Sequence, residues 1–322
     1  MKIVMAADLH LCAGILKEMR ATTALLPEGF YGHVKNNRLY WHNEMLVERM
    51  PEMLNALRRF VEKERPDMCV FLGDMVNTNW AANVAVFKKG LASFRCKTMM
   101  VSGNHDLYLG ARHCRLEALF GVKLGMRSMM GDGIGVVFLD MFVKRNDMYF
   151  PSLGRTRLMQ GTEYRPDDLR KTLELLDKYR KKDFIILAHM PMCEPDKHIQ
   201  IEGRKMMTGF PRATAAFLDE LQMKKNFMGL IVGHQHFNHL QFLRHGFHWS
   251  LPSLCEYPCA CAVLDFQPGL VRGRLKILDT SCAKASLGSR GQKWPYGSDA
   301  ERCFEYRKNL PHRHSLPSLK KT

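Results

Sequence analysis

The sequence lacks the long hydrophobic runs that mark a membrane-spanning protein. Its apolar stretches, such as residues 68–72 and 136–139, fall far short of the roughly 18 residues that a spanning helix needs. Lys2 and Asp8 place two charges within the first ten residues, where a secretory leader would carry its apolar core. We therefore expect no membrane span and a cytoplasmic location.

The sequence also has no internal repeat and no regular cysteine spacing. Its ten cysteines are scattered through a chain that is too large to need disulfides, so we expect reduced thiols. Cys255, Cys259 and Cys261 lie in the segment CEYPCAC, whose first spacing suits zinc, but no second pair follows at a matching distance. We interpret these three as small buried residues on strands.

What the sequence does have is the composition of a globular domain with a sizeable core. Of its 322 residues, 46% are hydrophobic and 25% are charged, which excludes a disordered, collagen-like or coiled-coil chain. The 48 Lys and Arg residues outnumber 32 Asp and Glu, for a formal charge of +16. Such an excess attracts anions, so nucleic acid, phosphorylated metabolites and membrane surfaces are candidate partners.

Short apolar runs that end abruptly in polar residues predict buried strands of an α/β protein. Five of them are KIVMAADLH, MCVFLGD, TMMVSGNHD, FIILAH and GLIVGHQH. Apolar residues at steps of three and four predict amphipathic helices between them, over residues 45–64, 166–181 and 212–225. Three further strands, at 247–254, 259–266 and 270–278, predict a closing β-meander.

Three stretches show neither the apolar runs of buried strands nor the three- and four-residue steps of helices. Residues 11–44 and 143–165 are long, mixed in composition and contain aromatics, and loops of this length are usually functional or disordered. The segment 280–322 holds nine Lys or Arg against three acids. We interpret it as a basic extension, which divides the chain into a domain at 1–279 and an extension at 280–322.

Residue types that bind metal recur where the five apolar runs end. In open α/β sheets the carboxyl ends of strands meet at one edge, so side chains there converge. Carboxylate, imidazole and amide oxygen donors suit borderline or harder divalent ions, and the lack of cysteine at these ends argues against a structural zinc cage. The five ends are Asp8-Leu9-His10, Gly73-Asp74, Gly103-Asn104-His105-Asp106, His189 and Gly233-His234-Gln235-His236.

The ordered set D-x-H, G-D, G-N-H-D, a lone His and G-H-x-H resembles the calcineurin-like metallophosphoesterase superfamily over roughly residues 1–279. The resemblance implies a four-layer α/β/β/α sandwich with a dinuclear metal centre at one edge of its two sheets. It implies two divalent ions, with Mn²⁺ expected and Fe or Zn as alternatives. In layout the chain is most similar to bacterial cyclic-nucleotide phosphodiesterases.

Residue roles follow from the matching motifs. The resemblance makes Asp8, His10 and His236 ligands of one metal, Asp74 the carboxylate that bridges both, and Asn104, His189 and His234 ligands of the other. It makes His105 a catalytic residue that contacts the phosphate and protonates the leaving group. Asp106 is expected to hydrogen-bond and orient that imidazole.

The function implied is a metal-dependent phosphohydrolase that uses a metal-bridging hydroxide as nucleophile. We expect a phosphodiesterase or broad phosphoesterase that acts on a small phosphorylated metabolite. Two alternatives stay open at this point. The basic charge and tail favour a DNA exonuclease of the same superfamily, and a member with a degraded site would be a non-catalytic, metal-binding interaction module. The oligomeric state is not indicated.

Overall fold

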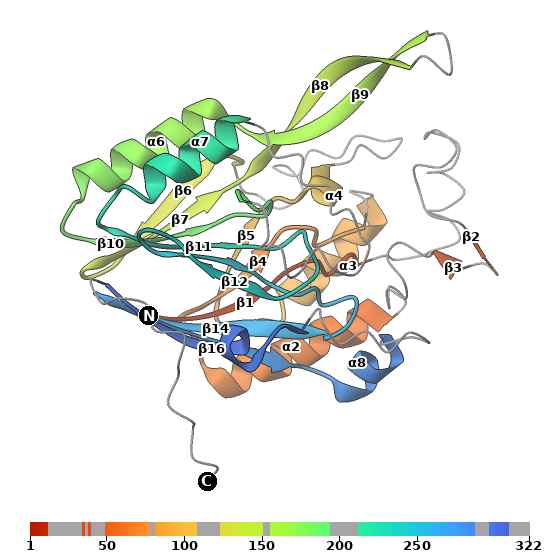
Figure 1. Cartoon of the computed structure of the whole chain (residues 1–322). Coiled ribbons are helices and arrows are strands. Elements are labelled where there is room, and N and C mark those ends of the chain that lie inside the picture. The colour runs from red at the N-terminus through yellow and green to blue at the C-terminus, as the bar shows by residue number, and fades with distance from the viewer. Residues whose placement is uncertain are drawn as a thin grey trace.

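Two six-stranded sheets lie face to face in the computed structural model (Figure 1). The structure describes residues 1–11, 34–35, 38–39, 49–77, 81–107, 123–150, 155–193, 212–286 and 296–308. The first sheet contains, in spatial order, β16 (Cys303–Arg307), β15 (Leu270–Ile277), β14 (Ala260–Gln267), β1 (Lys2–Ala6), β4 (Met68–Leu72) and β5 (Lys97–Val101). The second contains β12 (His239–Phe242), β13 (Phe247–Ser250), β11 (Phe227–Val232), β10 (Asp183–Leu187), β7 (Ile134–Leu139) and β6 (Met126–Met130).

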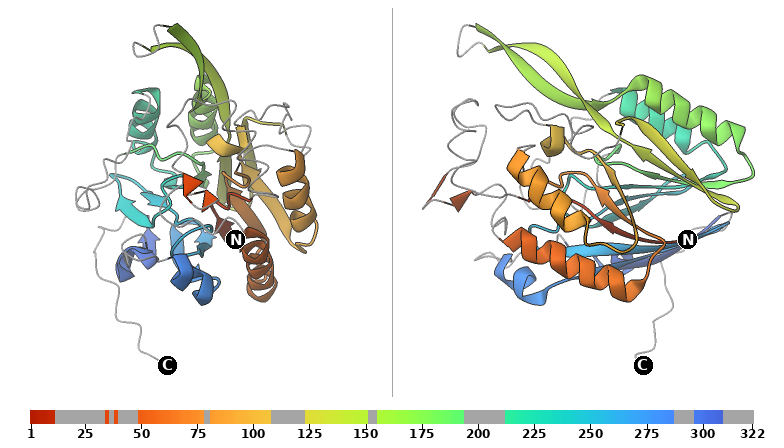
Figure 2. Two further views of the ribbon diagram at one scale, coloured as in Figure 1. Left: turned by 90° about the vertical axis from the view of Figure 1, so that its right-hand side faces the viewer. Right: turned by 180° about the vertical axis from the view of Figure 1, so that it is seen from behind.

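Helices cover the outer face of each sheet, which confirms the predicted four-layer sandwich. In Figures 1 and 2, α2 (Met50–Glu64) and α3 (Ala81–Leu91) lie outside the first sheet, and α6 (Pro166–Lys178) and α7 (Arg212–Leu221) lie outside the second. Three apolar clusters fill the three interfaces between layers. Because both faces of each sheet are covered, the central strands are apolar along their whole length, which is why they appear as continuous runs in the sequence.

The helix predictions at 45–64, 166–181 and 212–225 are confirmed in type and approximate position as α2, α6 and α7. Helix α2 buries Met53, Leu57 and Val61 at steps of four and ends at Arg65, which has the left-handed backbone conformation of a helix C-cap. Helix α3 was not predicted, because its buried residues, Asn83, Val84 and Phe87, span too few turns to show a helical period in the sequence. No helix in the described ranges is long and apolar enough to cross a membrane, and the cytoplasmic location stays a prediction.

The predicted meander needs one correction. Strand β13, from the predicted strand at 247–254, pairs in parallel with β11 and so belongs to the second sheet. Antiparallel pairing instead joins β14 to β15 and β15 to β16, so β16 takes the third place in the meander. The local sequence pattern cannot show which sheet a strand joins, because a buried strand has the same apolar pattern in either sheet.

The stretch at 143–165 is not a loop but most of a long β-hairpin. Strands β8 (Met141–Phe150) and β9 (Arg155–Tyr164) pair antiparallel from Met141↔Tyr164 to Phe150↔Arg155. The hairpin extends away from the sheets in Figure 1. Within the stretch at 11–44, the described residues include the short paired strands β2 (Val34–Lys35) and β3 (Arg38–Leu39), and most of the rest lies outside the described residues.

Part of the predicted basic extension is built into the first sheet. It contains α8 (Thr280–Ser286), α9 (Asp299–Arg302) and the edge strand β16. Phe304 of β16 is buried against Phe247 and Trp249 of the second sheet, with ring centroids 5.0 Å away in both cases. Gly273 lies opposite Phe304, and a Cβ there would come within 2.2 Å of its ring. The boundary at 279 therefore cuts through a sheet, while residues 309–322 lie outside the described part.

Replacing Phe304 with Ala should lower the free energy of unfolding by about 3–5 kcal/mol, because a buried ring between the sheets is lost and a cavity remains. Chemical denaturation followed by fluorescence or circular dichroism measures this. Arg307→Ala on the exposed end of the same strand is the control and should change stability by less than about 0.5 kcal/mol. Equal small effects of both variants would show that β16 is not part of the folded core.

Candidate metal centre

The five strand ends singled out in the sequence meet at one edge of the sandwich. Strands β1, β4 and β5 are mutually parallel in the first sheet, and β10 and β11 are parallel in the second. Their carboxyl ends therefore lie on the same side, and the polar residues that follow them gather there. Asn104, His105 and Asp106 lie in the short helix α4 (Asn104–Leu107), directly after β5.

The side chains that could bind metal form two sets, here called donor groups. The first donor group contains the side chains of Asp8, His10 and His236. The Nε2 atoms of His10 and His236 are 3.2 Å apart. Asp8 Oδ1 lies 3.3 Å from Nε2 of His236 and 4.0 Å from Nε2 of His10. All three side chains are nearly or fully buried, so they meet one another rather than water.

A second group contains His189, His234 and Asn104, and Asp74 connects it to the first. His189 Nε2 lies 3.1 Å from Asn104 Oδ1 and 3.4 Å from Asp74 Oδ2. The same Asp74 Oδ2 is 3.7 Å from His10 Nε2 of the first group. His234 offers a ring nitrogen within 4.8 Å of donor atoms of His189 and Asp74. The arrangement agrees with the ligand sets and the bridging role predicted above, which remain assignments to be tested.

Hydrogen bonds fix which nitrogen each ring turns toward the centre. His189 Nδ1 lies 2.7 Å from the carbonyl oxygen of Leu72. A carbonyl oxygen can only accept a hydrogen bond, so Nδ1 carries a proton and Nε2 is the atom that faces the metal centre. His236 Nδ1 lies 2.5 Å from Glu256 Oε1, which leaves its Nε2 facing His10. Imidazole, carboxylate and amide donors that converge in this way fit two divalent ions.

The backbone is held in an uncommon conformation where the donors leave their strands. Five non-glycine residues of the two groups have left-handed φ angles, between 45° and 70°: Asp8, His10, Asp74, His234 and His236. This conformation is unfavourable outside glycine and clusters at functional sites. Gly73 has a φ of 85°, and a Cβ on Gly103 would come within 2.1 Å of Asp74 Oδ1. The glycines of the motifs therefore allow the close packing of the donors.

Burial and mutual charge shift the pKa values in this cluster strongly. Burial alone would raise the pKa of Asp74, but the imidazoles of His189, His105 and His10 hold it well below its ordinary value. Burial lowers the pKa of His234 to about 3, helped by the positive charge of His189. Asp74 is thus an anion and His234 a neutral ring at neutral pH, which are the states that bind a cation.

The predicted contact between Asp106 and His105 is replaced by others. Asp106 accepts hydrogen bonds from the backbone N–H groups of Met75, Val76 and Gly103, at 2.9, 3.1 and 2.9 Å. The Nδ1 of His105 instead donates to the carbonyl oxygen of Asn77 at 2.8 Å. Asp106 therefore fastens the loop after β4 to the loop after β5, and the backbone of Asn77 orients the imidazole.

The family model for calcineurin-like phosphoesterases matches residues 1–238 of the sequence. The chain belongs to this family. No curated protein sequence gives a significant match. Calcineurin-like phosphoesterases are hydrolases that require metal, and the family implies two divalent ions, for which the two donor groups around Asp74 are the candidates.

Solved structures with a similar fold share little sequence with this phosphoesterase. A dimetal phosphatase from Danio rerio is 14% identical, with a TM-score of 0.61 over 86% of this chain and 96% of that one. A purple acid phosphatase from yellow lupin (Lupinus luteus) is 14% identical, with a TM-score of 0.51 over 100% of this chain and 57% of that one. GAP50, described as the anchor in the inner membrane complex of Plasmodium, is 10% identical, with a TM-score of 0.50 over 99% of this chain and 92% of that one.

Three residues of this phosphoesterase site were missed in the sequence. Glu256 supports His236, and Cys255 lies in one donor group with His10 and His236. Both follow β13, whose carboxyl end lies at the same edge because β13 is parallel to β11. Asp140, directly after β7, accepts from the backbone N–H of Ser102 at 2.8 Å and so braces the loop that carries Asn104. The expectation that side chains converge at the carboxyl ends of strands would have identified all three residues, once β7 and β13 were placed in the second sheet.

Replacing Glu256 with Gln should weaken metal binding about 10- to 100-fold, because the neutral amide oxygen accepts a weaker hydrogen bond from His236 Nδ1 and no longer supports the basicity of the ring. Titration of the metal-depleted protein with Mn²⁺, followed calorimetrically, measures the affinity. Glu301→Gln is the matched control, since Glu301 Oε1 lies 2.9 Å from Nδ1 of buried His239, outside the donor groups. A Glu256→Gln variant with the affinity of Glu301→Gln would contradict the supporting role.

Replacing Asp74 with Ala should remove most of both metal ions, whereas Asp8→Ala should leave about one, because Asp74 faces both donor groups. Elemental analysis after reconstitution with Mn²⁺ and gel filtration measures the content. The unchanged protein should hold two equivalents under the same conditions. Two tightly held ions in Asp74→Ala would show that this carboxylate is not the bridge.

Proposed function

We propose that the protein is a phosphodiesterase that acts on a small phosphorylated metabolite. The observation that carries this proposal is the pair of donor groups that share Asp74, with His105 packed beside them. The ring centroids of His105 and His10 are 4.5 Å apart, and the rings meet edge to face. A group able to move a proton therefore lies beside the two donor groups.

The two donor groups would hold the divalent ions through Asp8, His10 and His236 on one side and Asn104, His189 and His234 on the other, with Asp74 between them. Two ions held in this way supply a water of lowered pKa and neutralise the charge on the phosphoryl oxygens. Mn²⁺ is the ion we propose for the oxygen-containing second group, because Asn104 and Asp74 offer hard donors there.

His105 has the position of a general acid. Its Nδ1 proton is committed to the carbonyl oxygen of Asn77, which holds the ring plane in place. Proton transfer to a leaving oxygen would then use Nε2, while the Nδ1 hydrogen bond persists in both protonation states. The hydrogen bond from the backbone N–H of His105 to Asp74 Oδ1, at 2.8 Å, ties the imidazole to the bridging position.

One alternative is supported by the charge of the chain. The excess of 48 Lys and Arg over 32 Asp and Glu favours nucleic acid as the substrate, as in a DNA exonuclease of the same family. A non-catalytic interaction module would not need all seven donor side chains together with a positioned His105. We therefore rank it last.

Hydrolysis assays distinguish these functions. Bis(p-nitrophenyl) phosphate, p-nitrophenyl phosphate, cyclic AMP and single-stranded DNA are each tested with Mn²⁺ and with a chelator. We expect Mn²⁺-dependent hydrolysis of the diesters that the chelator abolishes. Preference for single-stranded DNA would favour the exonuclease, preference for the monoester would overturn the diesterase proposal, and inactivity on all four with metal bound would favour the module.

Replacing His105 with Ala should leave the metal content unchanged and lower the rate on an alkyl phosphodiester by about 10²- to 10⁴-fold, because proton donation to the leaving group is lost. The loss on a p-nitrophenyl diester should be smaller, since that leaving group departs without a proton. Steady-state rates on the two substrates measure the difference. Equal losses on both would restrict His105 to phosphate binding.

Asp106→Asn is the contrasting variant. Its amide oxygen can still accept from the backbone of Met75 and Val76, but its amide nitrogen cannot accept from the backbone N–H of Gly103, so the link between the loops after β4 and β5 should loosen. We expect reduced metal content and similar losses on both diesters. A leaving-group dependence like that of His105→Ala would mean that Asp106 acts through the imidazole after all.

A further inference from the structure

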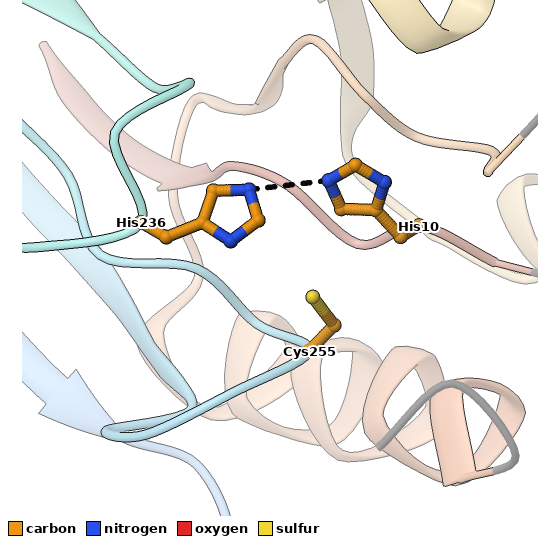
Figure 3. Close-up of side chains that lie close together, drawn as sticks. All are labelled: His10, His236 and Cys255. Carbon is orange, nitrogen blue, oxygen red and sulfur yellow. Dashed lines mark hydrogen bonds between the residues drawn. The ribbon is translucent and has the colours of Figure 1, made fainter. Parts of the chain in front are cut away.

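Cys255 lies at the first donor group, where the resemblance to the family predicted no sulfur ligand. One donor atom each from His10, His236 and Cys255 lie within 4.8 Å of one another. Figure 3 shows the sulfur of Cys255 directed toward the space between the two imidazoles. The residue is fully buried, and its loop follows β13 at the edge where the other donors gather. Its neighbours are therefore fixed by the fold and not by chance contact at the surface.

The hydrogen bonds around Cys255 satisfy the sulfur with or without its proton. Ser253 Oγ is 3.0 Å from Sγ of Cys255 and 2.8 Å from the carbonyl oxygen of Asp8. When the Ser253 hydroxyl donates to that carbonyl, the thiol donates to Ser253. When the sulfur is a thiolate, the same hydroxyl turns and donates to the sulfur instead, while the backbone N–H of Cys255 continues to donate to Ser253 Oγ at 2.9 Å.

Other roles for this sulfur fit the structure less well. Among the described residues, Cys255 forms no disulfide with Cys259 or Cys261. A role in packing alone does not explain why the sulfur lies beside the Nε2 atoms of His10 and His236, which face each other at 3.2 Å. A divalent ion between such rings deprotonates a thiol that reaches it.

We propose that Cys255 provides a thiolate ligand to the ion held by Asp8, His10 and His236, and that this sulfur makes the first position selective for Zn²⁺ or Fe²⁺ over Mn²⁺. The inference rests on the two-ion centre of the proposed function. In the binding step the thiol proton leaves to solvent and a sulfur lone pair forms the metal–sulfur bond. Soft thiolate ligands select zinc and iron, while oxygen-rich sites suit manganese.

Cobalt substitution tests this assignment without any assay of activity. The full chain is stripped of metal, reduced and titrated with Co²⁺ alone, and its near-ultraviolet absorption is recorded. We expect a sulfur-to-cobalt charge-transfer band that grows with one equivalent of Co²⁺. Cys255→Ser should lose the band while it still binds cobalt. Cys261→Ser is the matched control, because Cys261 is also buried and free but lies outside the donor groups, and it should keep the band.

Two further measurements keep the test independent of how the variant folds. X-ray absorption of the unchanged protein with one equivalent of Zn²⁺ should show one sulfur neighbour at about 2.3 Å. Competition between Zn²⁺ and Mn²⁺ should favour Zn²⁺ at the first position, and Cys255→Ser should reduce that preference about tenfold or more.

The failure of this inference differs from the failure of the proposed function. Two equivalents of bound cobalt without a charge-transfer band, or zinc with nitrogen and oxygen neighbours alone, would overturn the sulfur ligand and leave the two-ion centre standing. A band that persists in Cys255→Ser would also overturn it. Absence of any tight cobalt or zinc binding would overturn both proposals.

Discussion

The carboxylate of Asp74, buried at the edge where the strand ends of the two sheets meet, is the group on which the site depends. It faces His10 from the first sheet at 3.7 Å and His189 from the second at 3.4 Å, and the backbone N–H of His105 donates to its other oxygen. Burying a carboxylate is costly unless charges and hydrogen bonds compensate. The two sheets must therefore stay in register with each other for the site to exist, and the apolar cluster between them holds that register.

The strand ends could be predicted from the sequence because burial of both sheet faces leaves an unmistakable pattern. Continuous apolar runs ending in Asp8, Asp74 or His189 require that the chain leave the core there. The pairing partner of a strand leaves no such local trace. Strand β13 was therefore assigned to the meander, and the residues after it, Cys255 and Glu256, were not placed at the site.

Other errors have the same physical origin. Strands β8 and β9 pair with each other in a sheet of two, so neither has the two neighbours that make a strand uniformly apolar. Their mixed composition resembles a loop for that reason. Strand β16 is an edge strand of five residues with alternating burial. The basic residues just before it and at its end, Arg302 and Arg307, made the segment look like a basic extension and concealed Phe304 and Tyr306, which are core residues. The role of Asp106 carried over from the family motif differs from its contacts in the structure, because its carboxylate accepts from backbone N–H groups of the loops after β4 and β5.

The charges of the site and of the whole chain act at different ranges on a phosphorylated substrate. The net charge of +16 draws anions toward the molecule. At the site itself acidic and imidazole groups alternate: Asp74 faces His10 and His189, and His236 lies between Asp8 and Glu256. These partners offset one another's charge, so the side chains alone give a phosphate little attraction. Divalent ions in the donor groups would add the positive charge that a phosphoryl group needs, so occupancy of the centre should raise substrate affinity as well as turnover.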